Sequence, residues 1–220
     1  MRDKNKITIS SILIFIFSVS ISLWAWPQFP EGALLVTHFD AHGNPNGYSS
    51  TLFGLLILPV LQVTTSLLFF FLPKIEPRRL NLQQSKKSYM GLWLSIQIFL
   101  SYLHLSIVFF NLGLWDDPVA TLPSALLILF FVVGYLIRNS SSNFFIGVRT
   151  PWTLSSELSW KKTNKNTGLI LMISSLSGLI LKTIDAIVLS INFVIWGILF
   201  ISIIAIVMSF IYWRKEKFDV

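Results

Sequence analysis

Three groups of polar residues in this largely apolar chain have types and spacings that would suit binding chemistry, and the first is a set of possible metal ligands. An extended backbone at His38-Phe39-Asp40-Ala41-His42 would place His38, Asp40 and His42 on one face, because side chains alternate along a strand. Two imidazoles and one carboxylate suit zinc or a similar ion. The turn signal that follows, Gly43 to Gly47, favours instead a surface turn whose polar side chains bond to nearby backbone. We therefore expect no metal site and keep these three residues as the candidate ligands.

The second group lies within an apolar stretch. Gln97, Ser101 and His104 are spaced by four and three residues and so share one face of a helix. Polar and ionisable residues inside a membrane are candidates for function, which here would be transport or lipid handling through Gln97 and His104. The same side chains can also form hydrogen bonds to neighbouring helices and hold a bundle together. We favour this second interpretation.

The third group centres on Arg149, which is followed by Thr150 and Pro151. A guanidinium beside a rigid turn can form paired hydrogen bonds with a carboxylate or a phosphate. A lipid headgroup, an acidic partner segment or Glu157 would each fit. The alternative is an interfacial segment that only packs on the helices, and the residues leave function and packing equally open.

The polar segment around Arg149, residues 138–167, is far longer than a connector between helices needs to be. Its aromatic and aliphatic residues indicate an ordered structure. Ser155 or Ser156 is suited to cap a short helix, with Glu157 favourably placed in the first turn.

Composition points to a membrane protein. Of the 220 residues, 54% are apolar and 12% are charged, and the mean hydropathy is +0.70; a soluble domain has about 25% charged residues. The absence of cysteine excludes disulfides, thiolate metal sites and cysteine nucleophiles. The net charge of +7 lies in loops that flank apolar stretches, so we expect no direct contact with nucleic acid.

Six apolar stretches are long enough, or nearly so, to cross a hydrocarbon core of about 30 Å as helices. They are residues 7–26, 52–72, 90–110, 120–137, 168–187 and 191–212. With six crossings, all lysines and arginines except Lys182 fall on one side, which basic residues mark as cytoplasmic. The sequence therefore predicts an all-α, multi-pass protein of a bacterial cell membrane with six transmembrane helices and both termini in the cytoplasm.

The chain shows none of the common catalytic patterns. It has no HExxH, no GxSxG, no phosphate-binding glycine loop and no pair of carboxylates within an apolar stretch. We expect a protein that is not an enzyme and that needs no cofactor.

Two parts of the sequence resemble known bacterial families. The motif Asn143-x-x-x-Gly147-x-Arg149-Thr150-Pro151-Trp152, with Trp160-Lys161 following, resembles the signature loop of the SdpI-like family of membrane proteins. By this resemblance the family signature falls on Asn143, Gly147, Arg149, Thr150, Pro151, Trp152, Trp160 and Lys161.

The outer loop, residues 27–50, is similar to a small two-helix domain of unknown function that often precedes SdpI-like sequences. The matching residues are Pro30, His38, Gly43, Pro45, Gly47 and Tyr48. The chain departs from that pattern at Val36, where proline is usual, and at Asp40, where asparagine is usual. His42 is no fixed part of the pattern, which argues further against a metal site.

Together the resemblances imply two modules. Residues 1–80 would form an N-terminal two-helix module with an ordered outer loop at 27–50, and residues 81–220 an SdpI-like four-helix module with its signature loop at 138–167. The family resemblance implies immunity to a secreted, membrane-active peptide toxin, which would meet the protein on its outer side. It also implies possible signalling, in which a transcriptional repressor or another cytoplasmic protein is held at the membrane.

Overall fold

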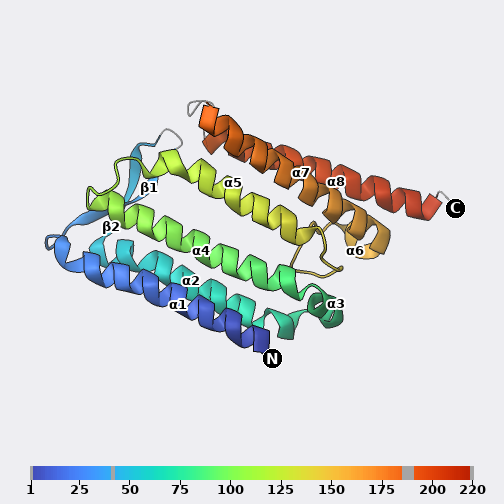
Figure 1. Ribbon diagram of the computed structural model, residues 1–220, viewed down its shortest axis with the longest axis horizontal. Coiled ribbons are helices and arrows are strands. Elements are labelled where there is room, and N and C mark those ends of the chain that lie inside the picture. Colours follow the sequence, from blue (N-terminus) through green and yellow to red (C-terminus); the bar gives the residue numbers. More distant parts are fainter. Residues whose placement is uncertain (1, 41–42, 185–190, 219–220) are drawn as a thin grey trace. The chain divides into compact units, whose positions relative to one another are not determined.

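The protein is built mainly from long helices (Figure 1). The computed structural model describes residues 2–40, 43–184 and 191–218. Within these described residues, five helices are long and apolar enough to cross a membrane, over Asn5–Gln28, Thr51–Ile75, Lys86–Asn111, Ala120–Ile137 and Phe193–Phe218. The expectation of a helical membrane protein is therefore confirmed.

The expected span at 168–187 is not among those five. It lies in helix α7 (Glu157–Ile184), whose first part is polar and whose apolar part begins near Gly168. The last three residues of the expected span, 185–187, lie outside the described residues. The count of six spans and the cytoplasmic location of both termini remain predictions.

The helices fall into two compact units, and the first comprises residues 1–70 and 93–125. It contains α1 (Arg2–Ala25), the short 3-10 helix η1 (Trp26–Gln28), most of α2 (Thr51–Ile75) and most of α4 (Lys86–Asn111). These three long helices lie side by side (Figure 1). Ala25, Leu35, Leu55 and Val108 form a buried apolar cluster near the hairpin that joins α1 to α2.

That hairpin consists of β1 (Leu34–Phe39) and β2 (Pro45–Ser50), which pair in antiparallel orientation. The side chain of Asn111, the last residue of α4, attaches β1 to the helices. Its Oδ1 accepts from the Val36 N–H at 2.8 Å, and its Nδ2 donates to the Val36 carbonyl at 2.9 Å. The Asn111 amide thus forms with β1 the two hydrogen bonds that a neighbouring strand would form, and it fixes the hairpin to α4.

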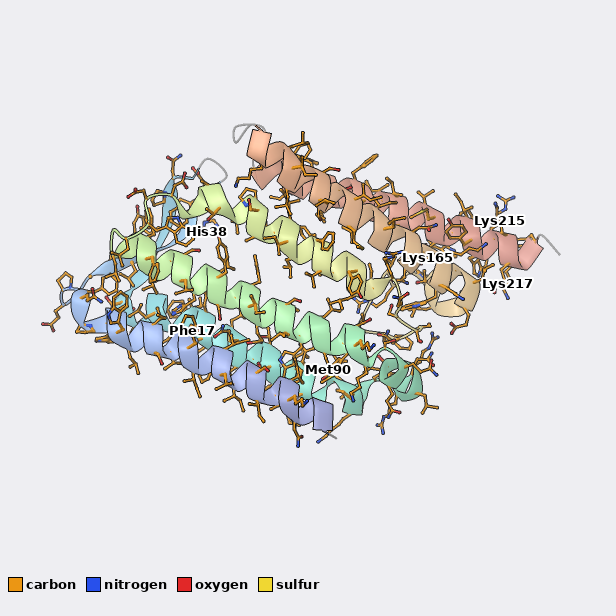
Figure 2. The ribbon with its side chains drawn as sticks, in the orientation of Figure 1. Phe17, His38, Met90, Lys165, Lys215 and Lys217 are labelled. Carbon is orange, nitrogen blue, oxygen red and sulfur yellow. The ribbon has the colours of Figure 1, made fainter. Side chains whose placement is uncertain are left out.

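The second unit comprises residues 71–92 and 126–220. It contains α3 (Arg79–Gln84), most of α5 (Pro118–Ile137), α6 (Pro151–Ser155), α7 and α8 (Ile191–Phe218). Helices α7 and α8 pack as an antiparallel pair, and α6 packs on both (Figure 1). Lys165 lies near the start of α7, and Lys215 and Lys217 lie at the adjacent end of α8 (Figure 2).

Glycines allow α5 and α7 to approach each other closely. A Cβ atom on Gly134 would lie 2.6 Å from the carbonyl oxygen of Gly168, and one on Gly168 would lie 2.4 Å from that of Gly134. Small residues permit such contact between membrane helices. The two units reflect packing in space, and the division of the sequence at residues 80 and 81 stays a prediction.

Candidate functional site

The signature loop was expected at residues 138–167, but α7 already begins at Glu157. We therefore use the name for residues 138–156, which are anchored by a carboxylate from the connector between α2 and α3. Glu76 is fully buried. Its Oε1 accepts a hydrogen bond from the Arg78 N–H at 2.8 Å, and its Oε2 accepts one from the Phe144 N–H at 3.0 Å. Glu76 therefore joins the end of α2 directly to the backbone of the loop.

Arg78 holds the same loop at two further points. Its Nη1 donates to the Ser142 hydroxyl, and its Nη2 donates to the Leu154 carbonyl at 2.7 Å. The guanidinium also lies over the Phe144 ring, 5.1 Å from its centroid, in a cation–π contact. The connector thus binds both the beginning and the end of the signature loop.

Asn143 satisfies the backbone at the centre of the loop. Its Oδ1 accepts from the N–H groups of Phe145 and Ile146 at 2.8 and 2.7 Å, and its Nδ2 donates to the Ser141 carbonyl at 2.8 Å. The side chain is fully buried. Because buried backbone groups need partners, Asn143 serves to hold the turn in shape.

Gly147, Trp160 and Asn164 hold the next part of the loop against α7. Asn164 Oδ1 accepts from the Val148 N–H at 2.7 Å, and Trp160 Nε1 donates to the Ser140 carbonyl at 2.7 Å. Gly147 has a φ of +112°, and a Cβ atom there would lie 2.4 Å from Asn164 Oδ1. Both its conformation and its surroundings require glycine.

Thr150 begins α6 and ties it to α8. Its hydroxyl accepts from the Thr153 N–H at 3.1 Å in a capping box, and it donates to Ser209 Oγ at 2.9 Å. Pro151 occupies the first turn, where a missing N–H costs nothing. Trp152 meets the Phe210 ring edge-on, with the ring centroids 5.2 Å apart.

The signature residues therefore divide into two classes. Asn143, Thr150 and Trp160 are buried and position the loop, whereas Arg149, Pro151 and Lys161 are exposed. Arg149 Nη1 donates to the Phe144 carbonyl at 2.6 Å. Among the described residues no carboxylate forms an ion pair with Arg149, so the structure does not supply Glu157 as its partner. A lipid headgroup and an acidic partner segment remain as its possible ligands.

Comparison with known proteins agrees with this architecture. Residues 140–213, which include the ordered loop and the α7–α8 pair, match the SdpI/YfhL protein family. Residues 13–63, from α1 to α2 with the hairpin between them, match a domain of unknown function (DUF1648). Both resemblances inferred from the sequence are confirmed.

One curated relative extends over both parts. The chain is 26% identical over 170 residues to a protein named Immunity protein SdpI from Bacillus subtilis (strain 168). The similar region covers 76% of this chain and 77% of that protein. No solved structure matches the chain.

Sequence reasoning missed the residues that anchor the signature loop. These residues are Glu76, Arg78 and Asn81, and the Asn81 Nδ2 donates to the Ser142 carbonyl at 2.8 Å. The available signal was Glu76, the one acidic residue between Lys74 and Lys87. A single carboxylate among basic residues is a candidate for a buried structural contact.

The polar residues of α4 lie in the centre of the first unit. Gln97 Nε2 donates to Thr65 Oγ1 at 2.9 Å and to the Gln62 carbonyl at 3.2 Å, while Gln62 Nε2 donates to Ser101 Oγ at 2.8 Å. Both glutamines are fully buried. Gln97 of α4 thus donates to α2, and Gln62 of α2 donates to α4, so hydrogen bonds from each helix join the two.

His104 connects α4 to α1 in the same way. Its Nε2 lies 3.0 Å from Ser22 Oγ and 3.1 Å from the Ser18 carbonyl. Ser18 Oγ in turn lies 3.1 Å from Ser101 Oγ. The structure thus places the polar face of α4 where its side chains bond to both neighbouring helices.

The polar residues of the hairpin form hydrogen bonds with one another within its own turn. His38 Nδ1 lies 2.6 Å from Asn46 Oδ1, and Asp40 accepts from the backbone and side-chain nitrogens of Asn44 at 2.9 and 3.2 Å. Strand β1 ends at Phe39, so Asp40 does not continue the strand that the metal hypothesis assumed. His42 lies outside the described residues, and those that are described contain no group of three potential metal ligands.

The other outer-loop residues shape the ends of the hairpin. The Pro30 carbonyl accepts from the Ala33 N–H at 3.1 Å, Gly43 has a φ of +88°, and Pro45 faces Phe39 in the register. Gly47 faces His38, and a Cβ atom on Gly47 would lie 2.8 Å from the His38 Cβ. Tyr48 is 59% exposed and is available for contact on this surface.

Proposed function

We propose that the chain is a non-enzymatic membrane protein that gives a bacterium immunity to a secreted, membrane-active peptide toxin. The observation that carries this proposal is the similarity to an immunity protein over 76% of this chain and 77% of the relative. Because the similar region includes most of both proteins, it supports a common activity better than a shared motif would.

The ordered signature loop supports a recognition role. Backbone and buried side chains fix its shape, while Arg149 and Pro151 stay exposed on it and Lys161 stays exposed in the first turns of α7. A rigid surface that presents cations avoids the entropy cost of ordering a loop on binding. We propose that Arg149 is required for protection through an anionic ligand.

The outer and inner partners would meet the protein on opposite sides of the membrane. The hairpin, with Tyr48 exposed, would meet the toxin together with the outer helix ends. A cytoplasmic protein, such as a transcriptional repressor, would meet the basic surface of Lys161, Lys165, Lys215 and Lys217, which are all exposed. This arrangement rests on the predicted location of both termini in the cytoplasm.

A protection assay tests the proposal. The chain is expressed in a toxin-sensitive bacterium, which is challenged with membrane-active peptide toxins. Wild type should protect, and Arg149→Ala should not, at equal amounts in the membrane. Arg79→Ala is the matched control, because Arg79 is also exposed and donates one hydrogen bond to a backbone carbonyl, that of Lys74 at 2.7 Å.

Each outcome of this assay is informative. If wild type protects against none of the toxins, the immunity proposal is wrong. If Arg149→Ala protects fully, the signature loop is not the site, and Tyr48→Ala then tests the hairpin.

A second candidate function is transport or lipid handling through Gln97 and His104. One observation favours it: Gln62 Oε1, Gln97 Oε1 and His104 Nδ1 are buried and have no hydrogen-bond partner within the described part of the chain. Such oxygen and nitrogen atoms can accept a hydrogen bond from a proton donor or from a water molecule. The hydrogen bonds of the same side chains to α1 and α2 support the structural interpretation, which the His104 variant in the Discussion tests.

A further inference from the structure

A cavity of about 450 Å³ lies in the second unit beside the signature loop. Its walls are mostly aliphatic and aromatic side chains from the membrane-spanning helices, such as Phe130 and Val133 of α5 and Ile201 and Ala205 of α8. Residues Phe145 to Thr150 of the loop also line it, and we call this part the loop end. The volume is within the range of about 300–1,000 Å³ that is typical of ligand pockets.

Polar groups gather at the loop end of this cavity. Arg149 is its one charged lining residue, and only its Nη1 has a hydrogen-bond partner, the Phe144 carbonyl, among the residues described. Thr167 also lines the cavity, and it is 4% exposed. Its Oγ1 is buried without a hydrogen-bond partner in the described part of the protein. The main part of the cavity therefore suits an apolar group. Its loop end suits an anionic group whose oxygen atoms accept hydrogen bonds.

The apolar walls exclude a peptide as the occupant. A peptide carries an N–H and a C=O at nearly every residue, and each must be satisfied in an apolar environment. Besides Arg149 and Thr150 at the loop end, the only polar side chains of the lining are those of Thr167 and Ser202, and Ser202 already donates to the Ile198 carbonyl at 2.8 Å. A hydrocarbon chain needs no such partners.

The positive charge of Arg149 at the loop end favours a ligand that joins a hydrocarbon chain to an anionic headgroup. A guanidinium forms paired hydrogen bonds with a phosphate, and the cytoplasmic leaflet, which Arg149 is predicted to face, is rich in anionic lipids. We propose that the cavity binds one acyl chain of an anionic phospholipid, whose phosphate is held by Arg149 and whose ester oxygens lie near Thr167.

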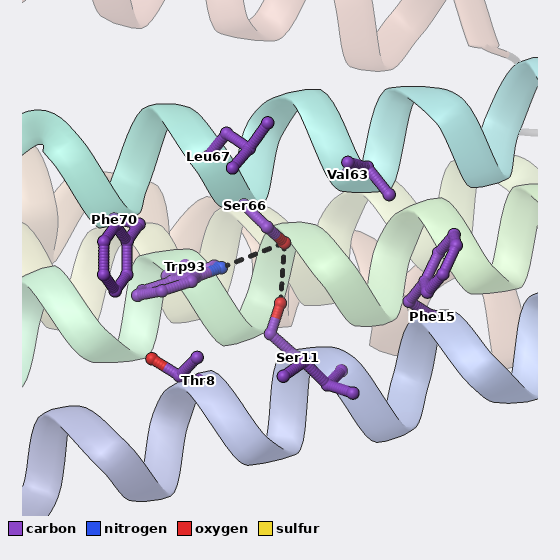
Figure 3. A pocket seen from close by; sticks show the side chains of 9 residues that line it. Thr8, Ser11, Phe15, Val63, Ser66, Leu67, Phe70 and Trp93 are labelled. Atoms are coloured by element: carbon purple, nitrogen blue, oxygen red, sulfur yellow. Dashed lines mark hydrogen bonds between the residues drawn. The ribbon is translucent and has the colours of Figure 1, made fainter.

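A hollow in the first unit provides an internal comparison (Figure 3). It has a volume of about 230 Å³ and lies on α1, α2 and α4. Its lining contains no charged residue, and the hydroxyls of Ser11 and Ser66 bond to each other at 2.7 Å. Acyl chains that enter this hollow find no group that distinguishes one headgroup from another.

Lipid retention tests the proposal directly. The full chain is placed in nanodiscs with equal amounts of phosphatidylglycerol and phosphatidylcholine, then transferred gently to detergent, and retained lipids are counted by native mass spectrometry. Wild type should retain phosphatidylglycerol preferentially. Arg149→Gln should retain about tenfold less of it, the equivalent of about 1.4 kcal/mol, while Arg79→Gln should retain as much as wild type.

A second variant tests the cavity itself. Ala205→Leu adds bulk to a buried wall residue and should reduce retention of both lipids without any change in charge. Should that variant fail to fold, Ile201→Phe, at a neighbouring wall position, replaces it. Added inorganic phosphate should not displace the lipid, because it lacks the chain.

Three results would overturn the proposal. They are equal retention of both lipids by wild type, wild-type retention by Arg149→Gln, and an equal loss in Arg79→Gln, which would indicate only the general surface charge. The measurement uses purified protein without toxin, so it is independent of the proposed immunity. A protein that retains the lipid but does not protect cells would overturn the immunity proposal alone.

Discussion

Glu76 and Phe144 lie 68 residues apart in the chain, and a hydrogen bond of 3.0 Å joins the Glu76 carboxylate to the Phe144 N–H. The same carboxylate accepts from the N–H of Arg78, whose guanidinium lies over the Phe144 ring. The connector after α2 and the signature loop therefore form one hydrogen-bonded structure. The conformation of the loop, and with it the position of Arg149, depends on a residue outside the family signature.

We expect Glu76→Ala to destabilise the protein by about 2–4 kcal/mol, because two backbone N–H groups would lose their acceptor in a largely buried site. Thermal unfolding in detergent measures the loss. Glu157→Ala is the matched control: Glu157 is exposed in the first turn of α7, where a carboxylate contributes about 0.3–1 kcal/mol. An equal effect of the two substitutions would show that the buried hydrogen bonds of Glu76 are unimportant.

Two glycines with positive φ allow the steric demand of the loop to be separated from backbone strain. Gly147 has a φ of +112° and no room for a Cβ atom, whereas Gly113 has a φ of +68° and nothing within 4 Å of an added Cβ. Gly113→Ala should cost only the strain of the left-handed conformation, about 1 kcal/mol. Gly147→Ala should cost about 2 kcal/mol more, since Asn164 must move and release the Val148 N–H. Unfolding measurements that give the same value for both would argue against close packing at Gly147.

The elements that the sequence predicted well depend on local signals. Continuous apolar runs indicated the long helices. Of the two serines suited to cap a short helix, Ser156 accepts from the Ser159 N–H at 2.9 Å, but the helix that begins there is the long α7, which continues to Ile184. The glycine-rich turn indicated a compact outer loop. Strand β1 nevertheless ends at Phe39, one residue before Asp40, whose carboxylate bonds to the backbone of Asn44.

The features that sequence reasoning missed depend on contacts between distant residues. Nothing in the spacing of Glu76 or Arg78 relates them to a loop more than 60 residues later. The sequence indicated one polar face on α4, but it could not indicate that Gln62 and Ser22 provide its partners, because that pairing depends on how α1, α2 and α4 pack against one another. The cavity beside Arg149 likewise exists only after α5, α7 and α8 have packed.

His104 discriminates between a structural and a transport role for the polar bundle. We expect His104→Phe to lower stability only modestly, by about 1 kcal/mol, because hydrogen bonds between membrane helices average about 0.6 kcal/mol. Protection against toxin should persist at equal membrane levels. Stability is measured by unfolding in detergent, and protection by the survival of challenged cells. A variant that folds at normal levels but has lost all activity would favour the transport hypothesis.

The antiparallel arrangement of α7 and α8 predicts that the start of α7 and the end of α8 both face the cytoplasm. Lys165 and Lys217 lie at the same end of this antiparallel pair (Figure 2), so both residues must face the same compartment if both helices cross. The chain has no cysteine, and single Lys165→Cys and Lys217→Cys variants therefore provide unique labelling sites. Both should react with a membrane-impermeant maleimide only after the cells are made permeable.

Glu31→Cys, on the loop between η1 and the hairpin, is the control for the outer side and should react in intact cells. Labelling of Lys217→Cys from outside, with Lys165→Cys protected, would mean that only one of the two helices crosses. Five spans would then replace six, and the basic end of α8 would face the outside, contrary to the tendency of lysine and arginine to remain in the cytoplasm. The cytoplasmic surface proposed for a protein partner would lose Lys215 and Lys217, so this labelling pattern decides whether that surface exists.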